Sequence, residues 1–217
     1  MTLLACSACL TAVLAAGPAP ATPDARFWAW FEANAGRLAA AKPPSEALLD
    51  EVQRELQRAA PGLAFELGRD GPGGPSVFVV SADGLRERFP AVERFVAAAP
   101  KVKGWRIVAF RQRLPAFTVD LGGVVLDPKD VWFRAEPEGG IVHVVVHVPG
   151  LDARPQEAVQ MAVMILLDST VGEYDVETRL GAIELAPLPA RPAAAGLKPL
   201  AELARVVDEA KKRGPGR

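Results

Sequence analysis

Cysteine and histidine are scarce in this chain of 217 residues, which has only two of each. Both cysteines, Cys6 and Cys9, lie near the N-terminus, so the remaining sequence has no thiol to act as a nucleophile, disulfide partner or zinc ligand. Their spacing is that of a redox motif, but the strand-and-helix context of a thioredoxin-type site is absent. Beyond the first residues, these absences exclude thiol chemistry.

An excess of charge of either sign is also absent. The 25 Lys and Arg residues nearly balance 26 Asp and Glu residues, which leaves a net charge of -1. Proteins that bind the phosphate backbone usually have a basic excess, so we expect no nucleic-acid partner. With 50% hydrophobic and 24% charged residues, the composition indicates a globular protein and excludes a disordered chain.

No hydrophobic run is long enough to predict a transmembrane span. Residues 1–23 carry no charge, but their apolar run, Leu10 to Ala16, is shorter than the roughly 20 residues that a spanning helix needs. The small residues that follow resemble a signal-peptide cleavage zone, and the sequence before Cys6 resembles a lipoprotein box, although no basic residue opens the segment. We expect residues 1–23 to be a signal or lipoprotein segment with a lipid anchor at Cys6. The protein would then be exported, either periplasmic or lipid-anchored, and the alternative is a cytoplasmic location.

From Asp24 onward, periodic patterns predict helices and strands in groups. The helices are expected from Asp24 to the Pro43-Pro44 pair, from an N-cap at Ser45 to Pro61, from Asp83 to Pro100 with a break at Pro90, at Pro155–Ser169 and at Pro199–Lys211. The strands are expected at Leu63–Leu67, Val77–Ser81, Trp105–Arg111, Val131–Glu136, Ile141–Val148 and Leu180–Leu185. This grouping predicts an α+β fold: a mostly antiparallel sheet with helices packed on one face, two N-terminal helices, and one buried helix before the last strand.

The domain organisation follows from the same patterns. We expect one α+β domain at residues 24–188, a linker rich in proline and alanine at 189–198, and a C-terminal amphipathic helix with a basic tail at 199–217. The last helix either docks on the domain or extends to a partner.

His143 and His147 are the only histidines, and they lie in the valine-rich run IVHVVVHV. Residues four apart on a strand are about 13 Å from each other, too far to bind one metal ion. Alternation places both histidines on the face opposite the valines, and the valine face is expected to pack on the helices. We therefore expect no metal site, and nothing in the sequence indicates a cofactor.

The densest group of polar residues is LLDSTVGEYDVETR at residues 166–179. Asp168 lies in the last turn of the predicted buried helix, where an acid opposes the helix dipole at a cost of about 0.3–1 kcal/mol. Two interpretations remain open. In the first, the carboxylates line a cleft and bind a cation or act as general acid and base. In the second, Asp168 pairs with Arg179 or another buried arginine, and Glu173 to Glu177 form a solvated turn. The candidate residues are Asp168, Glu173, Tyr174, Asp175, Glu177 and Arg179.

Two arginines on the predicted strand at 105–111 and just beyond it complete the candidate set. Arg111 and Arg113 differ by two positions and therefore point to the same side, whereas Arg106 points to the other. Together they could bind an anion, or they could serve as counter-charges for the acidic group at 168–177.

Several motifs resemble one family of bacterial proteins that is known only as a domain of unknown function. They include FWAWFEANAGRL, GLAFELG, VVSADGLRERFPAVERFVAAAP, GWRIVAFR, DVWF and, most specifically, LLDSTVGEYDVETRLGAIE. The resemblance spans Phe27 to about Leu203. It implies one integral α+β domain that includes the C-terminal helix, and it brings no activity, cofactor or catalytic residue.

The leading functional hypothesis is a non-enzymatic module that binds a protein or a small ligand. The chain has no catalytic motif, no usable histidine pair and no cysteine after position 9. The alternative is a hydrolase or a metal-assisted enzyme that uses Asp168, Glu173, Asp175 and Glu177.

Overall fold

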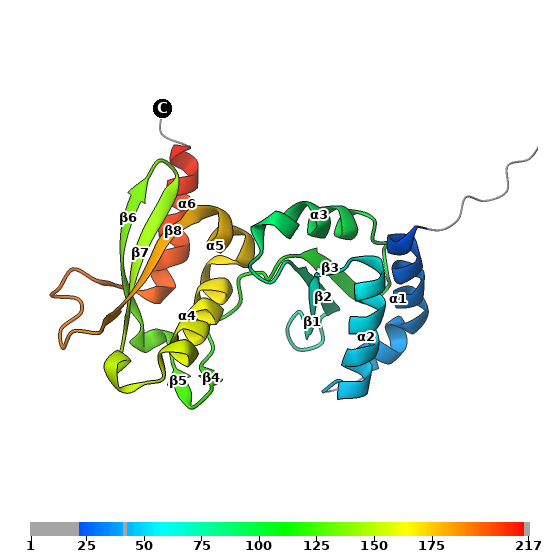
Figure 1. The fold of residues 1–217 in the computed structure, drawn as a ribbon, viewed down its shortest axis with the longest axis horizontal. Coiled ribbons are helices and arrows are strands. Elements are labelled where there is room, and N and C mark those ends of the chain that lie inside the picture. The colour runs from blue at the N-terminus through cyan, green and yellow to red at the C-terminus, as the bar shows by residue number, and fades with distance from the viewer. Residues whose placement is uncertain (1–21, 41–42, 215–217) are drawn as a thin grey trace, which may run out of the picture.

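A computed structural model describes residues 22–40 and 43–214 (Figure 1). Residues 1–21, which include Cys6 and most of the expected signal or lipoprotein segment, lie outside the described residues, as do residues 215–217 of the basic tail. No helix in the described part is both long and apolar enough to cross a membrane.

The N-terminal half contains three helices and a three-stranded sheet (Figure 1). In the sheet order β1-β2-β3, β1 pairs with β2 antiparallel and β3 joins β2 parallel. The elements are α1 (Pro23–Ala40), α2 (Glu46–Ala59), β1 (Ala64–Arg69), β2 (Ser76–Ser81), α3 (Phe89–Ala97) and β3 (Trp105–Ala109).

Aromatic residues form the core of this half. Phe27 and Phe31 are one turn apart on α1 and pack against Phe78 of β2, with ring centroids 5.9 and 4.8 Å away. The Ser45 hydroxyl caps α2 by accepting a hydrogen bond from the Leu48 N–H (3.3 Å), as the sequence predicted. Helix α1 buries Phe27, Trp28, Phe31, Ala35 and Leu38, and α2 buries Leu48, Val52 and Leu56.

The C-terminal half contains a four-stranded sheet in the order β8-β7-β6-β9 and a separate hairpin of β4 and β5. Strand β6 pairs antiparallel with β7 and β9, while β8 pairs parallel with β7. The elements are β4 (Val119–Leu121), β5 (Val124–Leu126), β6 (Trp132–Glu138), β7 (Ile141–Val148), α4 (Gln156–Val171), α5 (Glu173–Arg179), β8 (Leu180–Pro187), β9 (Lys198–Pro199) and α6 (Leu203–Arg213). Short 3-10 helices occur at Arg86–Arg88, Pro128–Asp130, Leu151–Ala153 and Leu200–Glu202.

Helices α4 and α6 cover one face of this sheet (Figure 1). The valines of β7 alternate with half-exposed residues and are buried against the helices, so His143 and His147 lie on the opposite face, as predicted. Of the two alternatives for the C-terminal helix, the structure shows docking: Leu203 and Val207 of α6 are fully buried in this core.

The fold is α+β with mostly antiparallel sheets, which confirms the predicted class. The buried apolar residues gather in two clusters, one in each half. The boundaries at 24–188, 189–198 and 199–217 stay a prediction, because a cluster of apolar side chains does not by itself define a domain.

The structure differs from the sequence predictions at three places: one strand end, one hairpin that was missed, and one of the two alternatives for residues 173–177. Strand β3 ends at Ala109 instead of Arg111, because Phe110 takes a left-handed conformation (φ 64°) and turns the chain out of the ladder. The hairpin of β4 and β5 was not predicted. Residues 173–179 form helix α5 instead of a solvated turn.

Candidate functional site

Glu173 lies where the two halves meet, and its side chain is fully buried. One carboxylate oxygen, Oε1, accepts hydrogen bonds from the Ser81 hydroxyl (2.9 Å) and the Ala82 N–H (3.0 Å). The other, Oε2, accepts one from the Arg111 N–H (2.9 Å). The Glu173 N–H in turn donates to the Arg111 carbonyl (3.0 Å). A side chain of the C-terminal half thus binds backbone of the N-terminal half.

The strand ends explain why these donors are available. Strands β2 and β3 are parallel neighbours, so their C-terminal ends lie at the same edge of the sheet. Ala82 and Arg111 follow those ends, where the ladder supplies no acceptor. Gly172, with φ 92°, ends α4 and lets α5 begin with Glu173 aimed at this edge.

Arg111 is surrounded by carboxylates from three elements. Its guanidinium contacts Glu66 (2.5 Å), Asp83 (2.8 Å) and Asp168 (3.5 Å). Burial disfavours the charged form, but hydrogen bonds to Asp83 and Glu66 outweigh it and raise the pKa of Arg111. Arg111 therefore acts as a counter-charge, which was one of the two roles considered for it. It is also the arginine that pairs with Asp168.

Asp168 and Glu177 ionise less readily than ordinary carboxyl groups. Burial raises the pKa of Asp168 to about 6; the nearby Glu173 and Glu177 add to this rise and Arg111 opposes it. Burial and the charge of Glu173 also raise the pKa of Glu177. A carboxyl group that titrates near pH 6 can both donate and accept a proton near neutral pH, as general acids and bases do. This is the chemistry that the cluster could supply.

A second ion-pair network ties α5 to α6. Arg113 makes a bidentate contact with Asp208 (2.7 and 2.8 Å), approaches Asp175 at 3.2 Å and donates to the Val171 carbonyl (2.8 Å). Lys211 also pairs with Asp175. The hydrogen bond from Arg113 lowers the pKa of Asp208. Asp175 and Arg113 are thus occupied by contacts within the protein.

The remaining predicted residues have different surroundings. Tyr174 is 44% exposed and packs its ring against Phe89 and Phe110, at centroid distances of 5.4 and 5.2 Å. Arg179 has a buried Nε with no hydrogen-bond partner in the described part of the chain. The alternative that Arg179 pairs with Asp168 is not realised, because Arg111 takes that place.

Together these contacts make the predicted cluster a joint between the two halves. We call it the Glu173 joint; it consists of Glu173 and its partners Ser81, Ala82 and Arg111. Among residues 22–40 and 43–214, no three His, Cys, Asp or Glu side chains are placed to hold one metal ion.

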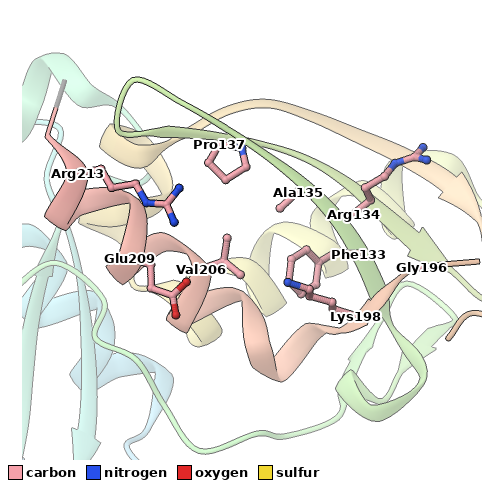
Figure 2. Close-up of a pocket in the computed structure, with 9 residues that line it drawn as sticks. All are labelled: Phe133, Arg134, Ala135, Pro137, Gly196, Lys198, Val206, Glu209 and Arg213. Atoms are coloured by element: carbon pink, nitrogen blue, oxygen red, sulfur yellow. The ribbon is translucent and has the colours of Figure 1, made fainter. Parts of the chain in front are cut away.

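A second candidate site, which the sequence did not reveal, lies between β6 and α6 (Figure 2). This β6–α6 groove has a volume of about 260 Å³. It is lined by Phe133, Arg134, Ala135, Pro137, Gly196, Lys198, Val206, Glu209 and Arg213. The lining comes from three segments far apart in the chain, so no local motif could have identified it.

The charges in the β6–α6 groove are not balanced within the described residues. Lys198 and Arg213 have no acidic partner within 4.0 Å among residues 22–40 and 43–214. The acid in the groove, Glu209, is bound to Arg205 at 2.8 Å. Figure 2 shows the Arg213 guanidinium directed toward Pro137 across the groove, while the guanidinium of Arg134 points away from α6. The groove therefore presents two cations without an ion-pair partner among the described residues, beside one acid that shares Arg205 with Glu202.

No family model, curated protein or solved structure matches this chain. The resemblance to a bacterial family of unknown function stays a prediction, and the function must be argued from the site itself.

Proposed function

We propose that the chain is a non-enzymatic module that binds a protein or a small ligand, and that the β6–α6 groove is its recognition surface. The observation that carries this proposal is the pair of cations, Lys198 and Arg213, without acidic partners in the described residues. Around the Arg111 guanidinium, by contrast, the ionisable groups contact one another. Charges left available to solvent attract an oppositely charged ligand, whereas paired charges do not.

The chemistry of the groove favours an anionic ligand with an apolar part. Ala135, Pro137 and Val206 supply carbon surface, and the cations Lys198 and Arg213 line the same groove. Binding sites commonly combine such an apolar lining with a few polar groups that fix orientation. A carboxylate or phosphate attached to a small apolar group fits this description.

A thermal-shift screen tests this proposal, with phosphate, citrate, glutamate and a nucleoside monophosphate as probes. A probe at 100 times its Kd adds about 2.7 kcal/mol to the free energy of unfolding, which raises the Tm of a chain this size by roughly 5–10 °C. We expect at least one anion to raise the wild-type Tm. The rise should be lost in a Lys198→Gln, Arg213→Gln double variant and kept in Lys212→Gln, a matched variant on α6 outside the groove lining. A rise that persists in the double variant, or no rise with any of these anions, contradicts the proposal.

An enzyme that uses the acidic cluster is the second candidate function, and one observation favours it. Asp168 has a pKa of about 6 and keeps 20% of its side chain exposed, so it could exchange a proton with a bound molecule. If metal ions assist such an enzyme, Mg²⁺, Mn²⁺ or Zn²⁺ should raise the wild-type Tm and leave that of Asp168→Asn unchanged. A metal-dependent rise confined to the wild type would favour the enzyme over the binding module.

A further inference from the structure

We infer that the β6–α6 groove receives an extended acidic peptide, which adds as a strand to the free edge of β6 and places carboxylates beside Lys198 and Arg213. This inference rests on the proposed function and names its ligand class. It depends on three features: the unpaired part of β6, the face on which the groove lies, and the charge of its lining.

Only the first part of β6 is paired on its outer edge. Strand β9 covers Trp132 and Phe133, opposite Pro199 and Lys198, and then the chain turns away at Gly196, where φ is 76°. Residues 134–138 continue along β7 without a second neighbour in the described structure. The free edge is therefore the continuation of β9.

The register identifies which backbone groups point to this edge. The Leu200 N–H donates to the Val131 carbonyl across the pair (3.0 Å), so every second residue from Val131 directs its N–H and C=O toward β9. This set contains Phe133, Ala135 and Pro137. Ala135 therefore offers one donor and one acceptor at the free edge, and Pro137 offers an acceptor only.

The prolines agree with this assignment. Pro199 of β9 lies opposite Trp132, and this pair makes no backbone hydrogen bonds in the register. Pro137 of β6 lies opposite Val142 of β7, which is also a pair without backbone hydrogen bonds. Because Pro137 has no N–H, the edge pairs poorly with a second copy of itself. A partner must therefore gain affinity from its side chains as well as its backbone.

The groove supplies those side-chain contacts. Residues directly opposite each other in an antiparallel pair point to the same face, so peptide residues opposite Ala135 and Pro137 point toward α6, as Lys198 does opposite Phe133. Figure 2 shows that Lys198 and Arg213 flank this position. An acidic residue there would lie near both cations. Glu209, the acid of the groove lining, contacts Arg205, which also contacts Glu202.

The size of the groove also favours a side chain over a free small molecule. Pockets that enclose drug-sized ligands usually have volumes of about 300–1,000 Å³. The volume here, about 260 Å³, is below that range, and the adjacent free strand edge can hold the rest of an extended peptide.

The test uses the full chain and a seven-residue peptide, blocked at both ends, with glutamate at positions three and five and valine or threonine elsewhere. Fluorescence anisotropy measures its Kd. Three matched peptides serve as comparisons: glutamine in place of both glutamates, N-methylation of both glutamates, and N-methylation of the residues between and beside them. Only the first two changes remove a group that faces β6 or the groove.

We expect the acidic peptide to bind, and the glutamine and glutamate-N-methylated peptides to bind at least about tenfold more weakly, which corresponds to roughly 1.4 kcal/mol. The Lys198→Gln, Arg213→Gln variant should lose a similar factor and Lys212→Gln less than about twofold. Binding should weaken as salt rises, because exposed charges are screened. Hydrogen exchange at the Ala135 amide should slow when the peptide is bound.

Equal affinity of the acidic and glutamine peptides overturns the inference, as does equal affinity when both glutamates are N-methylated. If no peptide binds at millimolar concentration while a small anion still raises the Tm through Lys198 and Arg213, the inference fails and the proposed function stands. If neither peptide nor anion binds, both fail.

Discussion

The environment of Asp168 raises the pKa of its carboxyl group. Its ordinary pKa is 3.8, and burial in the folded protein raises it to about 6. Between these values the folded state holds a proton that the unfolded state has released, so folding becomes less favourable as pH rises through this window. Below about pH 4 both states are protonated, and above about pH 6 both are ionised, with the charged carboxyl buried.

We predict that Asp168→Asn gains stability relative to the wild type between pH 4 and pH 7. The asparagine cannot ionise, so it avoids a destabilisation that reaches about 3 kcal/mol for the full difference in pKa. The pKa of Glu177 is also raised, but Glu177 is present in both proteins, so its effect on the free energy of unfolding largely cancels in the comparison. Urea denaturation of both proteins at pH 4, 5, 6 and 7 measures the difference. A difference that stays constant over this range contradicts the prediction.

At the scale of elements, the pairing of β7 with β8 depends on one glycine. The register shifts between Val142 and Val144, and at this irregularity His143 Nδ1 accepts a hydrogen bond from the Ala182 N–H (3.0 Å). A Cβ atom at Gly181 would lie 2.7 Å from both Cε1 and Nδ1 of the His143 ring and 2.9 Å from Cγ2 of Ile141. The imidazole therefore occupies space that only glycine leaves open.

We predict that Gly181→Ala destabilises the protein by roughly 0.5–1.5 kcal/mol, the usual cost of forcing a side chain off its rotamer, because the His143 ring must turn aside. Gly68→Ala is the matched control, because Gly68 also lies in a strand but has nothing within 4 Å of an added Cβ. Alanine there should be neutral or stabilise by up to about 1 kcal/mol. Thermal denaturation of the two variants checks this, and equal effects of both substitutions would show that the His143 contact is unimportant.

Elements with a strong period were predictable from the sequence, and elements shaped by tertiary contacts were not. The valines of β7 alternate with a period of two, and the apolar run within α4 belongs to a segment too long for a strand. The three-residue strands β4 and β5 are too short to display a period. Helix α5 looks like a polar turn in sequence. Its first residue, Glu173, is buried because distant strand ends supply hydrogen-bond donors to it, and local spacing does not show those donors.

The same distinction applies to the sites. The sequence could predict that Arg111 and Arg113 pair with the acidic group, because arginines and carboxylates close in space usually act as counter-charges. The β6–α6 groove could not, since Phe133, Lys198 and Arg213 become neighbours only when α6 docks and β9 pairs with β6.

At the scale of the whole molecule, the Glu173 joint lies between two hydrophobic cores, beside two other links between the halves: the Tyr174 ring against Phe89 and Phe110, and the Arg111–Asp168 ion pair. Each half buries its own apolar cluster, and this burial stabilises each half by itself. The buried carboxylate makes the halves interdependent, because separating them leaves an acceptor and its donors without partners.

We predict that Glu173→Ala destabilises the protein by about 3–5 kcal/mol and separates its unfolding into two transitions. The alanine leaves the Ser81 hydroxyl and the Ala82 and Arg111 N–H groups without their acceptor, and breaking a buried charged contact typically has a cost of this size. Glu177→Ala, on the same helix and only partly buried, should change stability by less than about 1 kcal/mol. Hydrogen exchange along a urea series distinguishes the halves by comparing α1 and α2 with β6 and β7. If the Glu173 variant opens both halves at one urea concentration, as the wild type is expected to do, the joint is not what couples them.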